Sequence, residues 1–310
     1  MALSGHPPLT LWRLTDGKPG HEKQTLGLAR ALQRLTGAAC HDITVQGGLP
    51  ATAARAWLHW LLGRFTPGAA LPSPDLILAA GHATHVPALA ARRVRGGRIV
   101  VLMRPSLPLA LFDLCVIPAH DQPAPRSNVI VTRGVLNAVA PGGDHDPRRG
   151  LILIGGPSRQ YRWDDAVIAA QVREIVVAQT DVTWTLTTSR RTPACFPSAL
   201  GTLPGLDLRP HTQTPPGGME EKLARSDQVW VSPDSGSMVY EALTAGCRVG
   251  LLELAPTPGS RIARDLAGLA EDGMVTPIAR WRREHALKPP RAGFNEAERC
   301  ARMILERWYA

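Results

Sequence analysis

Short apolar segments alternate with longer amphipathic ones along most of the chain. The short segments hold about three to seven mostly apolar residues and end in glycine, proline or polar side chains, which is typical of strands buried in a parallel sheet. They cover residues 9–14, 41–45, 75–79, 98–103, 112–118, 128–132, 151–154, 182–186, 229–231 and 248–252. Segments of helical period follow several of them, and these begin near residues 20, 164, 219, 235, 260 and 295. The alternation predicts an α/β fold built from doubly wound, Rossmann-like parallel sheets.

One segment interrupts this alternation near the middle of the chain. Residues 141–150 combine proline, glycine and charged side chains, a composition typical of a linker. A chain of 310 residues is long enough for two domains of ordinary size. We therefore expect an N-terminal domain over residues 1–145 and a C-terminal domain over residues 146–310. A second turn-rich segment, 204–218, is expected to be irregular.

The strongest candidate for a binding site follows the apolar segment 229–231. Asp234, Ser235 and Ser237 open a helix that runs to Gly246, so backbone N–H groups and the helix dipole face outward and favour an anion. Glu241 lies one helical turn after Ser237, where its carboxylate could accept from ribose hydroxyls. The alternative is that Asp234 or Ser235 only caps the helix and Glu241 is solvated. Capping explains one polar residue and leaves the other three unexplained, so we favour the binding site.

Two further loops in the second half carry similar chemistry. Gly155, Gly156 and Ser158 follow the segment 151–154 and could hold a phosphate through their N–H groups. Arg190 and Arg191, with neighbouring hydroxyls such as that of Ser189, follow the segment 182–186 and suit a phosphorylated ligand. Each loop has a simpler interpretation, a common turn for the first and a solvated arginine pair for the second.

The first half also places polar residues and glycines after its strands. Asp16, Gly17, Gly20, His21 and Gln24 cluster where the first helix begins, His82 follows Gly81 after the third strand, and Arg104 follows the fourth. In a parallel sheet all of these lie at one edge, where ligands bind. The alternatives are a glycine-rich turn with its caps in the first loop, and a histidine that caps a helix or bonds to the backbone in the second.

Composition narrows the functional classes. The formal charge is +9 and arginine supplies most of the cations, but no basic run suggests nucleic-acid binding. Five cysteines without Cys-x-x-Cys spacing argue against a disulfide framework or a zinc ribbon. We see no signal peptide and no apolar stretch of ~20 residues, so we expect a cytoplasmic protein.

Residues 51–65 combine tryptophans and leucines at helical spacing, which predicts either a helix packed on the core or a patch that contacts the inner membrane peripherally.

Three segments carry a resemblance to a known family. They are Thr15-Asp-Gly-Lys-Pro-Gly-His-Glu-x-Gln24, Thr188-Ser-Arg-Arg-Thr-Pro193 and Asp234-Ser-Gly-Ser-Met-x-x-Glu-Ala242. Together they resemble the family named after a plant mitochondrial-fission factor, the "elongated mitochondria" family, which has bacterial members. More distantly, the chain is similar to the GT-B glycosyltransferases. The similarity covers most of the chain and implies that the last helix, 295–310, packs back on the first domain.

The resemblance also implies a function. It implies a metal-independent glycosyltransferase that uses a nucleotide-sugar donor, no separate cofactor, and an acceptor from the cell envelope or linked to a lipid. The donor would bind to the second domain through Gly155, Gly156, Ser158, Ser189, Arg190, Arg191, Asp234, Ser235, Ser237, Met238 and Glu241. The first domain would supply the acceptor side, through Gly17, Gly20, Gln24 and Arg104. It would also supply the general base, for which Asp16 is the first choice and His21 or His82 the next.

Two other functions stay open. One is a non-catalytic or regulatory GT-B-like protein that binds a nucleotide sugar or a protein partner. The other is a sugar-nucleotide epimerase, which shares the fold.

Overall fold

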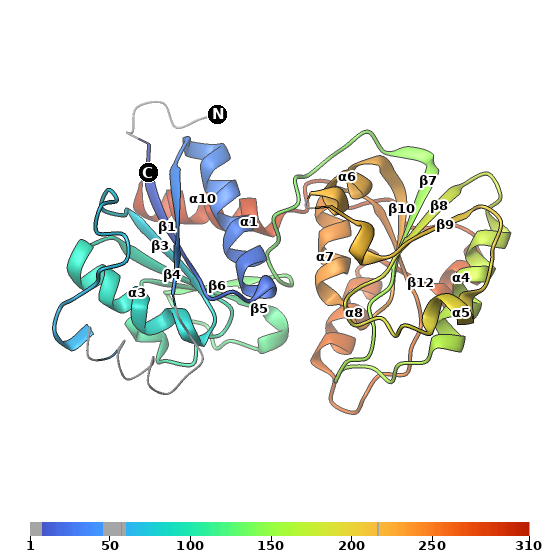
Figure 1. The fold of residues 1–310 in the computed structure, drawn as a ribbon, viewed down its shortest axis with the longest axis horizontal. Helices are drawn as coiled ribbons and strands as arrows, with labels where there is room; N and C mark the ends of the chain where they lie inside the picture. Colours follow the sequence, from blue (N-terminus) through green and yellow to red (C-terminus); the bar gives the residue numbers. More distant parts are fainter. Residues whose placement is uncertain (1–7, 46–56, 58–59, 216, 310) are drawn as a thin grey trace. The chain divides into compact units, whose positions relative to one another are not determined.

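The computed structural model describes residues 8–45, 57, 60–215 and 217–309. The chain divides into two compact units, the first made of Met1–Ala138 and Asn295–Ala310 and the second of Val139–Phe294. Each unit is built around one six-stranded, entirely parallel sheet with helices on both faces (Figure 1). The predicted fold class is therefore confirmed.

Unit 1 contains a sheet whose strands lie in the order β2-β1-β3-β4-β5-β6. Its elements are β1 (Thr10–Thr15), α1 (Pro19–Thr36), β2 (Ala39–Thr44), β3 (Leu76–Ala80), α3 (His82–Arg95), β4 (Arg98–Leu102), η1 (Leu109–Leu111), β5 (Leu114–Pro118), η2 (Ala119–Asp121), β6 (Val129–Thr132) and α10 (Glu296–Trp308). Its strands are apolar on both faces because helices cover both. Leu76 and Leu78 pack with α1 and α10, while Ile77 and Ala79 between them pack with α3 on the other face.

The C-terminal helix α10 completes unit 1, as expected. Asn295 caps it, because its side-chain oxygen accepts a hydrogen bond of 3.0 Å from the backbone N–H of Glu298. Its buried face packs on α1 and on the sheet. Glu296 also accepts a hydrogen bond of 2.9 Å from the backbone N–H of Arg133, just after β6.

Unit 2 contains a sheet with the strand order β12-β11-β10-β7-β8-β9. Its elements are β7 (Asp146–Leu153), α4 (Asp165–Ala178), β8 (Thr183–Thr187), α5 (Phe196–Leu200), β9 (Leu206–Arg209), η3 (His211–Gln213), α6 (Gly218–Arg225), β10 (Ser226–Val231), α7 (Gly236–Ala245), β11 (Arg248–Leu251), α8 (Arg261–Glu271), β12 (Thr276–Pro277) and α9 (Ile278–Glu284). Two buried tryptophans explain the glycines in its strands. A Cβ on Gly150 would lie 2.3 Å from the ring of Trp184, and one on Gly250 would lie 2.4 Å from that of Trp230.

The structure differs from the sequence-based expectation at several elements. Strand β7 begins at Asp146, inside the predicted linker, because its polar first half pairs with β10 and β8. Strand β9 lies inside the segment 204–218 that was expected to be irregular. The short β12 and the helix α9 lie in a stretch for which no element was predicted.

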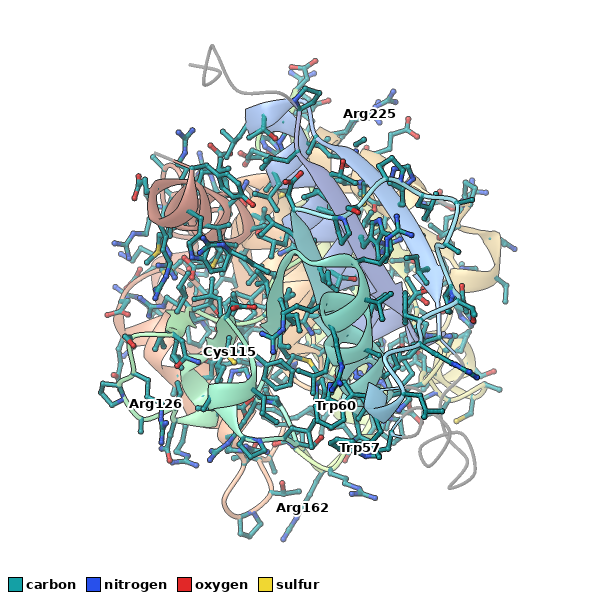
Figure 2. All side chains as sticks on the ribbon, turned by 90° about the vertical axis from the view of Figure 1, so that its left-hand side faces the viewer. Trp57, Trp60, Cys115, Arg126, Arg162 and Arg225 are labelled. Carbon is teal, nitrogen blue, oxygen red and sulfur yellow. The ribbon has the colours of Figure 1, made fainter. Side chains whose placement is uncertain are left out.

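The segment 51–65 is only partly described, because residues 51–56, 58 and 59 lie outside the described residues. Trp57 and Trp60 are in edge-to-face contact, with ring centroids 5.6 Å apart, at the surface of unit 1 (Figure 2). The side chains of Leu61 and Leu62 are exposed. In the described part of the chain, no helix combines the length and the apolar character needed to cross a bilayer.

Candidate functional site

Both sheets contain a point at which the strand order reverses. In unit 1, β1 and β3 are neighbours in the sheet, and the connection from β1 leads away to β2 on the other side. In unit 2, β7 and β10 are neighbours, and the chain passes through β8 and β9 before it returns to β10. Ligands of open α/β sheets bind outside the carboxyl ends of the strands at such points. The loops that the sequence singled out lie there: 16–21 and 81–82 in unit 1, and 155–158 and 232–237 in unit 2.

In unit 2, the side chain of Asp234 connects the two loops at the reversal point. Its carboxylate, 1% exposed, accepts hydrogen bonds from the backbone N–H of Gly156 at 2.9 Å and from the hydroxyl of Ser232 at 2.7 Å. The hydroxyl of Ser232 in turn accepts from the backbone N–H of Gly155 at 2.7 Å. A Cβ on Gly155 would lie 2.0 Å from the Asp234 carboxylate. Asp234 therefore holds the glycine loop in place, and both of its carboxylate oxygens are hydrogen-bonded to other residues of the protein.

The loop after β8 is held by the same network. The Arg191 guanidinium lies 2.7 Å from the Asp234 carboxylate and donates at 2.9 Å to the carbonyl of Gly156. The hydroxyl of Ser189 donates at 2.8 Å to the carbonyl of Gly155. A Cβ on Gly156 would lie 2.2 Å from the carbonyl oxygen of Arg191. Arg191, Ser189 and Asp234, which the sequence suggested as ligand contacts, thus fix the positions of three loops.

Several donors at this edge have no partner within the described residues. The Arg190 side chain is exposed and makes no hydrogen bond or ion pair there. The backbone N–H groups of Gly236 and Ser237 open α7 and lie ahead of its first internal hydrogen bonds. Ser235 is the N-cap residue, yet its hydroxyl makes no capping hydrogen bond. These groups form a cationic, donor-rich surface that suits an anion.

The remaining predicted residues of unit 2 lie near this surface. Ser237 is exposed and Met238 partly buried on the first turn of α7, whereas Glu241 is buried one turn further on, so the alternative of a solvated Glu241 does not hold. Ser158 lies in the glycine loop, where its hydroxyl accepts at 3.2 Å from the backbone N–H of Gln160.

In unit 1, Asp16 and His21 form a hydrogen-bonded pair at the reversal point. The Asp16 carboxylate, 1% exposed, lies 2.8 Å from Nδ1 of His21, and it also accepts from the backbone N–H of Lys18 at 3.2 Å. The His21 side chain is 20% exposed, and no described residue bonds to its Nε2 atom. An acceptor at Nδ1 favours the tautomer with its proton there, which leaves the Nε2 lone pair available to take a proton.

Gly81 allows this pair to lie against the end of β3. A Cβ at this position would be 2.2 Å from Nδ1 of His21 and 3.0 Å from the Asp16 carboxylate, and the backbone φ is +87°. Glycine is therefore required twice, by the conformation and by the space.

Two residues that the sequence-based prediction omitted also belong to this cluster. The Ser106 hydroxyl lies 2.6 Å from Nδ1 of His82 and 3.2 Å from Nδ1 of His85. His85 was visible as a second histidine one turn after His82, but no sequence signal marked Ser106 apart from its place after β4.

Burial affects the protonation of His85. It lowers the pKa of His85 to about 4, and the neighbouring His82 and His21 act in the same direction. The unfolded chain, with an ordinary histidine pKa of 6.5, takes up this proton first as the pH falls. The free energy of unfolding should therefore decrease between pH ~6.5 and ~4, by roughly 2–3 kcal/mol from this group. Urea unfolding of the wild type and His85→Gln across this range tests it, and an equally steep pH dependence in both would contradict the assignment.

The residues that were expected on the acceptor side lie around the same edge of the unit 1 sheet. Gln24 is buried and its amide donates to the Gly20 carbonyl at 3.2 Å and contacts the sulfur of Met103. The N–H of Gly17 donates to Glu22 at 3.0 Å. Arg104 is exposed and donates at 3.3 Å to the carbonyl of Asp121. Among the described residues, no group of three or more histidine, cysteine or acidic side chains has the arrangement of a metal site.

A family model described as Mitochondrial fission ELM1 matches residues 19–308. The chain belongs to this family. No curated protein matches it in sequence.

Several solved structures resemble this chain at low sequence identity. A Listeria monocytogenes protein assigned as a UDP-N-acetylglucosamine 2-epimerase is 14% identical, with a TM-score of 0.59 and 97% of each chain covered. The Neisseria meningitidis UDP-GlcNAc 2-epimerase, bound to UDP-GlcNAc, is 11% identical, with a TM-score of 0.55 over 96% of this chain and 99% of its own. The S. aureus MnaA protein, solved with UDP, is 14% identical, with a TM-score of 0.50 over 97% and 89%. These likenesses identify a GT-B-like fold for this family member.

Proposed function

We propose that this protein transfers a glycosyl group from a nucleotide sugar to a hydroxyl of an acceptor without a metal ion. The observation that carries the proposal is how hydrogen-bond partners are distributed at the two reversal points. In unit 2 the carboxylate of Asp234 is already hydrogen-bonded to Gly156 and Arg191, whereas the donors around Ser235 have no partner among the described residues. In unit 1 a buried carboxylate orients a histidine whose second nitrogen has no partner among the described residues.

Unit 2 would bind the diphosphate of the donor. The N–H groups of Gly236 and Ser237, the Ser235 hydroxyl and the Arg190 guanidinium would donate to its oxygens. Negative charge grows on the diphosphate as its bond to the sugar breaks, so the same donors would stabilise the transition state more than the bound substrate. Glu241 would accept from the ribose, with Met238 beside it. The UDP and UDP-GlcNAc bound by two structural relatives support a ligand of this class.

Unit 1 would supply the general base. The acceptor hydroxyl oxygen forms a bond to C1 of the sugar, the bond from C1 to the diphosphate oxygen breaks, and the hydroxyl proton passes to Nε2 of His21. Asp16, the first choice from the sequence, would act through His21, because its carboxylate is buried and already bonded to the imidazole. It would keep the ring in the correct tautomer and stabilise the imidazolium. His82 would be a neighbour of this base.

An envelope or lipid-linked acceptor is part of the proposal. Trp57, Leu61 and Leu62 expose apolar surface on unit 1, and the Arg93 guanidinium lies 5.4 Å from the Trp60 ring. Apolar side chains edged by arginine suit the surface of an anionic membrane, where such an acceptor would lie.

Epimerisation of the nucleotide sugar is the second candidate, favoured by the two UDP-GlcNAc 2-epimerase structures that cover nearly all of this chain. Both reactions begin from the same bound donor and differ in products. Transfer gives a free nucleotide and a glycosylated acceptor, whereas epimerisation gives an isomeric nucleotide sugar without an acceptor.

A binding experiment tests the donor site. Arg190→Gln should weaken the affinity for the nucleotide diphosphate about tenfold, because one charge-assisted contact is lost. The measurement is isothermal titration with UDP, GDP, ADP and their sugars. Arg283→Gln is the matched control, since Arg283 is an exposed arginine of the same unit without a hydrogen bond or ion pair in the described structure. Equal affinity in the two variants, or no binding of any nucleotide by the wild type, would refute the site.

A further inference from the structure

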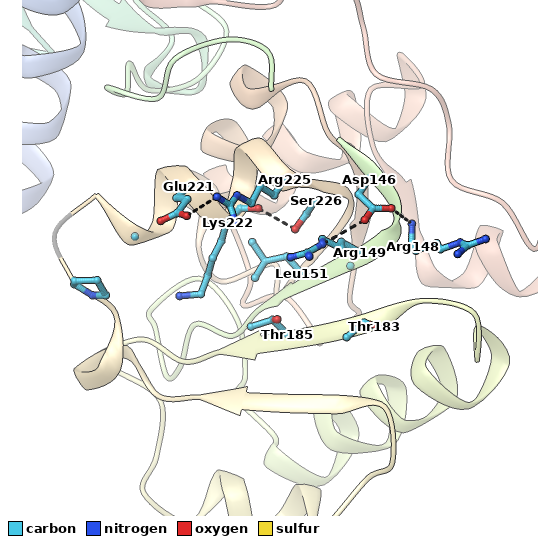
Figure 3. A pocket seen from close by; sticks show the side chains of 13 residues that line it. Asp146, Arg148, Arg149, Leu151, Thr183, Thr185, Glu221, Lys222, Arg225 and Ser226 are labelled. Atoms are coloured by element: carbon cyan, nitrogen blue, oxygen red, sulfur yellow. Dashed lines mark hydrogen bonds and ion pairs between the residues drawn. The ribbon is translucent and has the colours of Figure 1, made fainter. Parts of the chain in front are cut away.

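A pocket of about 510 Å³ opens at the amino-terminal edge of the unit 2 sheet (Figure 3). The first residues of β7, β8 and β10 form one side and α6 forms the other. The candidate donor site lies at the carboxyl ends of the same strands, so the two sites are at opposite edges of the sheet. The proposed transfer reaction makes no use of this pocket.

The lining carries more positive than negative charge. Arg148, Arg149, Lys222 and Arg225 contribute cations, against the carboxylates of Asp146 and Glu221. Both carboxylates are already paired, since Asp146 lies 3.3 Å from Arg149 and Glu221 lies 3.0 Å from Arg225.

Two of these cations stay available to a ligand. The half-buried Lys222 has no side-chain hydrogen bond or ion pair in the described parts of the chain, and Arg149 has only its exposed pair with Asp146. Figure 3 shows Lys222 directed from α6 into the pocket, above Thr185 of β8. Like charges that face one recess repel each other, and an anion bound there would relieve the repulsion.

Helix α6, which carries Lys222, is held in place by several contacts. The Ser226 hydroxyl donates to the carbonyl of Lys222 at 2.9 Å, and His145 lies 2.8 Å from the carbonyl of Ser226. A Cβ on Gly143 would lie 2.1 Å from the carbonyl of Ala224, so this loop packs directly on the last turn of α6. The pocket therefore exists before any ligand arrives, which lowers the entropic cost of binding.

The remaining lining defines what the anion would carry. Thr183 and Thr185 present hydroxyls that can bond to ligand hydroxyls, and the exposed Pro215 offers a small apolar surface of the kind that covers the face of a sugar ring. An arginine can bind phosphate through two parallel N–H bonds, and a lysine adds a point charge. The volume lies within the range of small-molecule sites and suits one ring with one phosphate.

We propose that this pocket binds a small soluble phosphate monoester of the sugar-phosphate type, at a site separate from the nucleotide donor. Glucose 1-phosphate is a suitable probe, with glucose and inorganic phosphate for comparison. The full chain should bind glucose 1-phosphate more tightly than phosphate and show no measurable binding of glucose up to about 10 mM. Lys222→Gln and Arg149→Gln should each weaken the affinity for glucose 1-phosphate about tenfold, and the double variant more.

Two control variants show whether the loss of affinity for glucose 1-phosphate is specific to this pocket. Arg190→Gln, at the donor site, and Arg283→Gln, on α9, should leave the affinity for glucose 1-phosphate unchanged. The double variant should keep the wild-type circular dichroism and nucleotide affinity, because the Arg149–Asp146 pair is exposed and contributes little to stability. A failure of this proposal can therefore be distinguished from a failure of the proposed donor site.

Three results would overturn the proposal. Wild-type affinity of the double variant for glucose 1-phosphate would move the ligand elsewhere, and loss of this binding in Arg190→Gln alone would assign it to the donor site. Absence of glucose 1-phosphate binding by the wild type, together with binding to phosphatidylglycerol vesicles that depends on Lys222 and Arg149, would assign the pocket to a lipid headgroup instead.

Discussion

Replacing His21 by glutamine is expected to lower kcat by about 10²–10⁴-fold while leaving the affinity for the nucleotide unchanged. Glutamine can still bond to Asp16, but it cannot take the proton from the acceptor hydroxyl. The proposed nucleotide contacts lie in unit 2, so nucleotide binding should not be affected. The measurements are steady-state kinetics with a nucleotide-sugar donor and titration with the nucleotide alone.

Asp16→Asn tests the proposed role of Asp16 as the residue that orients His21. An asparagine amide can donate to Nδ1 of His21 and so favour the opposite tautomer, which places the proton on Nε2, the nitrogen proposed to act as the base. It should therefore reduce kcat strongly while His21 is still present. His82→Gln is the matched control, because His82 bonds to Ser106 and not to Asp16. Full activity in His21→Gln together with loss of activity in His82→Gln would transfer the role of base to His82.

Asp234→Ala is expected to reduce the free energy of unfolding by roughly 2–4 kcal/mol. The substitution leaves the backbone N–H of Gly156 and the hydroxyl of Ser232 without their acceptor in a buried place. It also leaves Arg191 without its carboxylate, although this part counts less because the Arg191 side chain is 42% exposed.

Urea unfolding measures this loss of stability. Asp207→Ala is the control, because Asp207 pairs with Arg209 in an exposed ion pair that should contribute at most about 0.5 kcal/mol. If the two variants lose equal stability, Asp234 does not hold the loops together as described.

The fold could be predicted from the sequence because each buried strand is a short apolar run followed by glycine or polar residues. Strands that lack this pattern were missed. Strand β9 lies at the edge of its sheet, and its residues alternate between exposed and partly buried positions. The first half of β7 is polar because it is exposed, so its composition resembles that of a linker.

The location of the candidate site could also be predicted, but not the division of tasks among its residues. Asp234 and Arg191 were expected to contact a ligand, yet each is bonded to loops 35 to 78 residues away in the sequence. No local pattern reveals which of two adjacent arginines, Arg190 or Arg191, is committed to such a bond. Equally, the sequence placed Asp16 and His21 together but did not show that the carboxylate is buried behind the imidazole.

The composition of unit 1 from two separate parts of the chain affects how the protein is made. A ribosome delivers all six strands of this unit first, then the whole of unit 2, and only afterwards α10. Until α10 arrives, the leucines and alanines of α1 and of the adjacent sheet that will pack against it remain open to water. The unit that is synthesised first is therefore the one whose core is closed last.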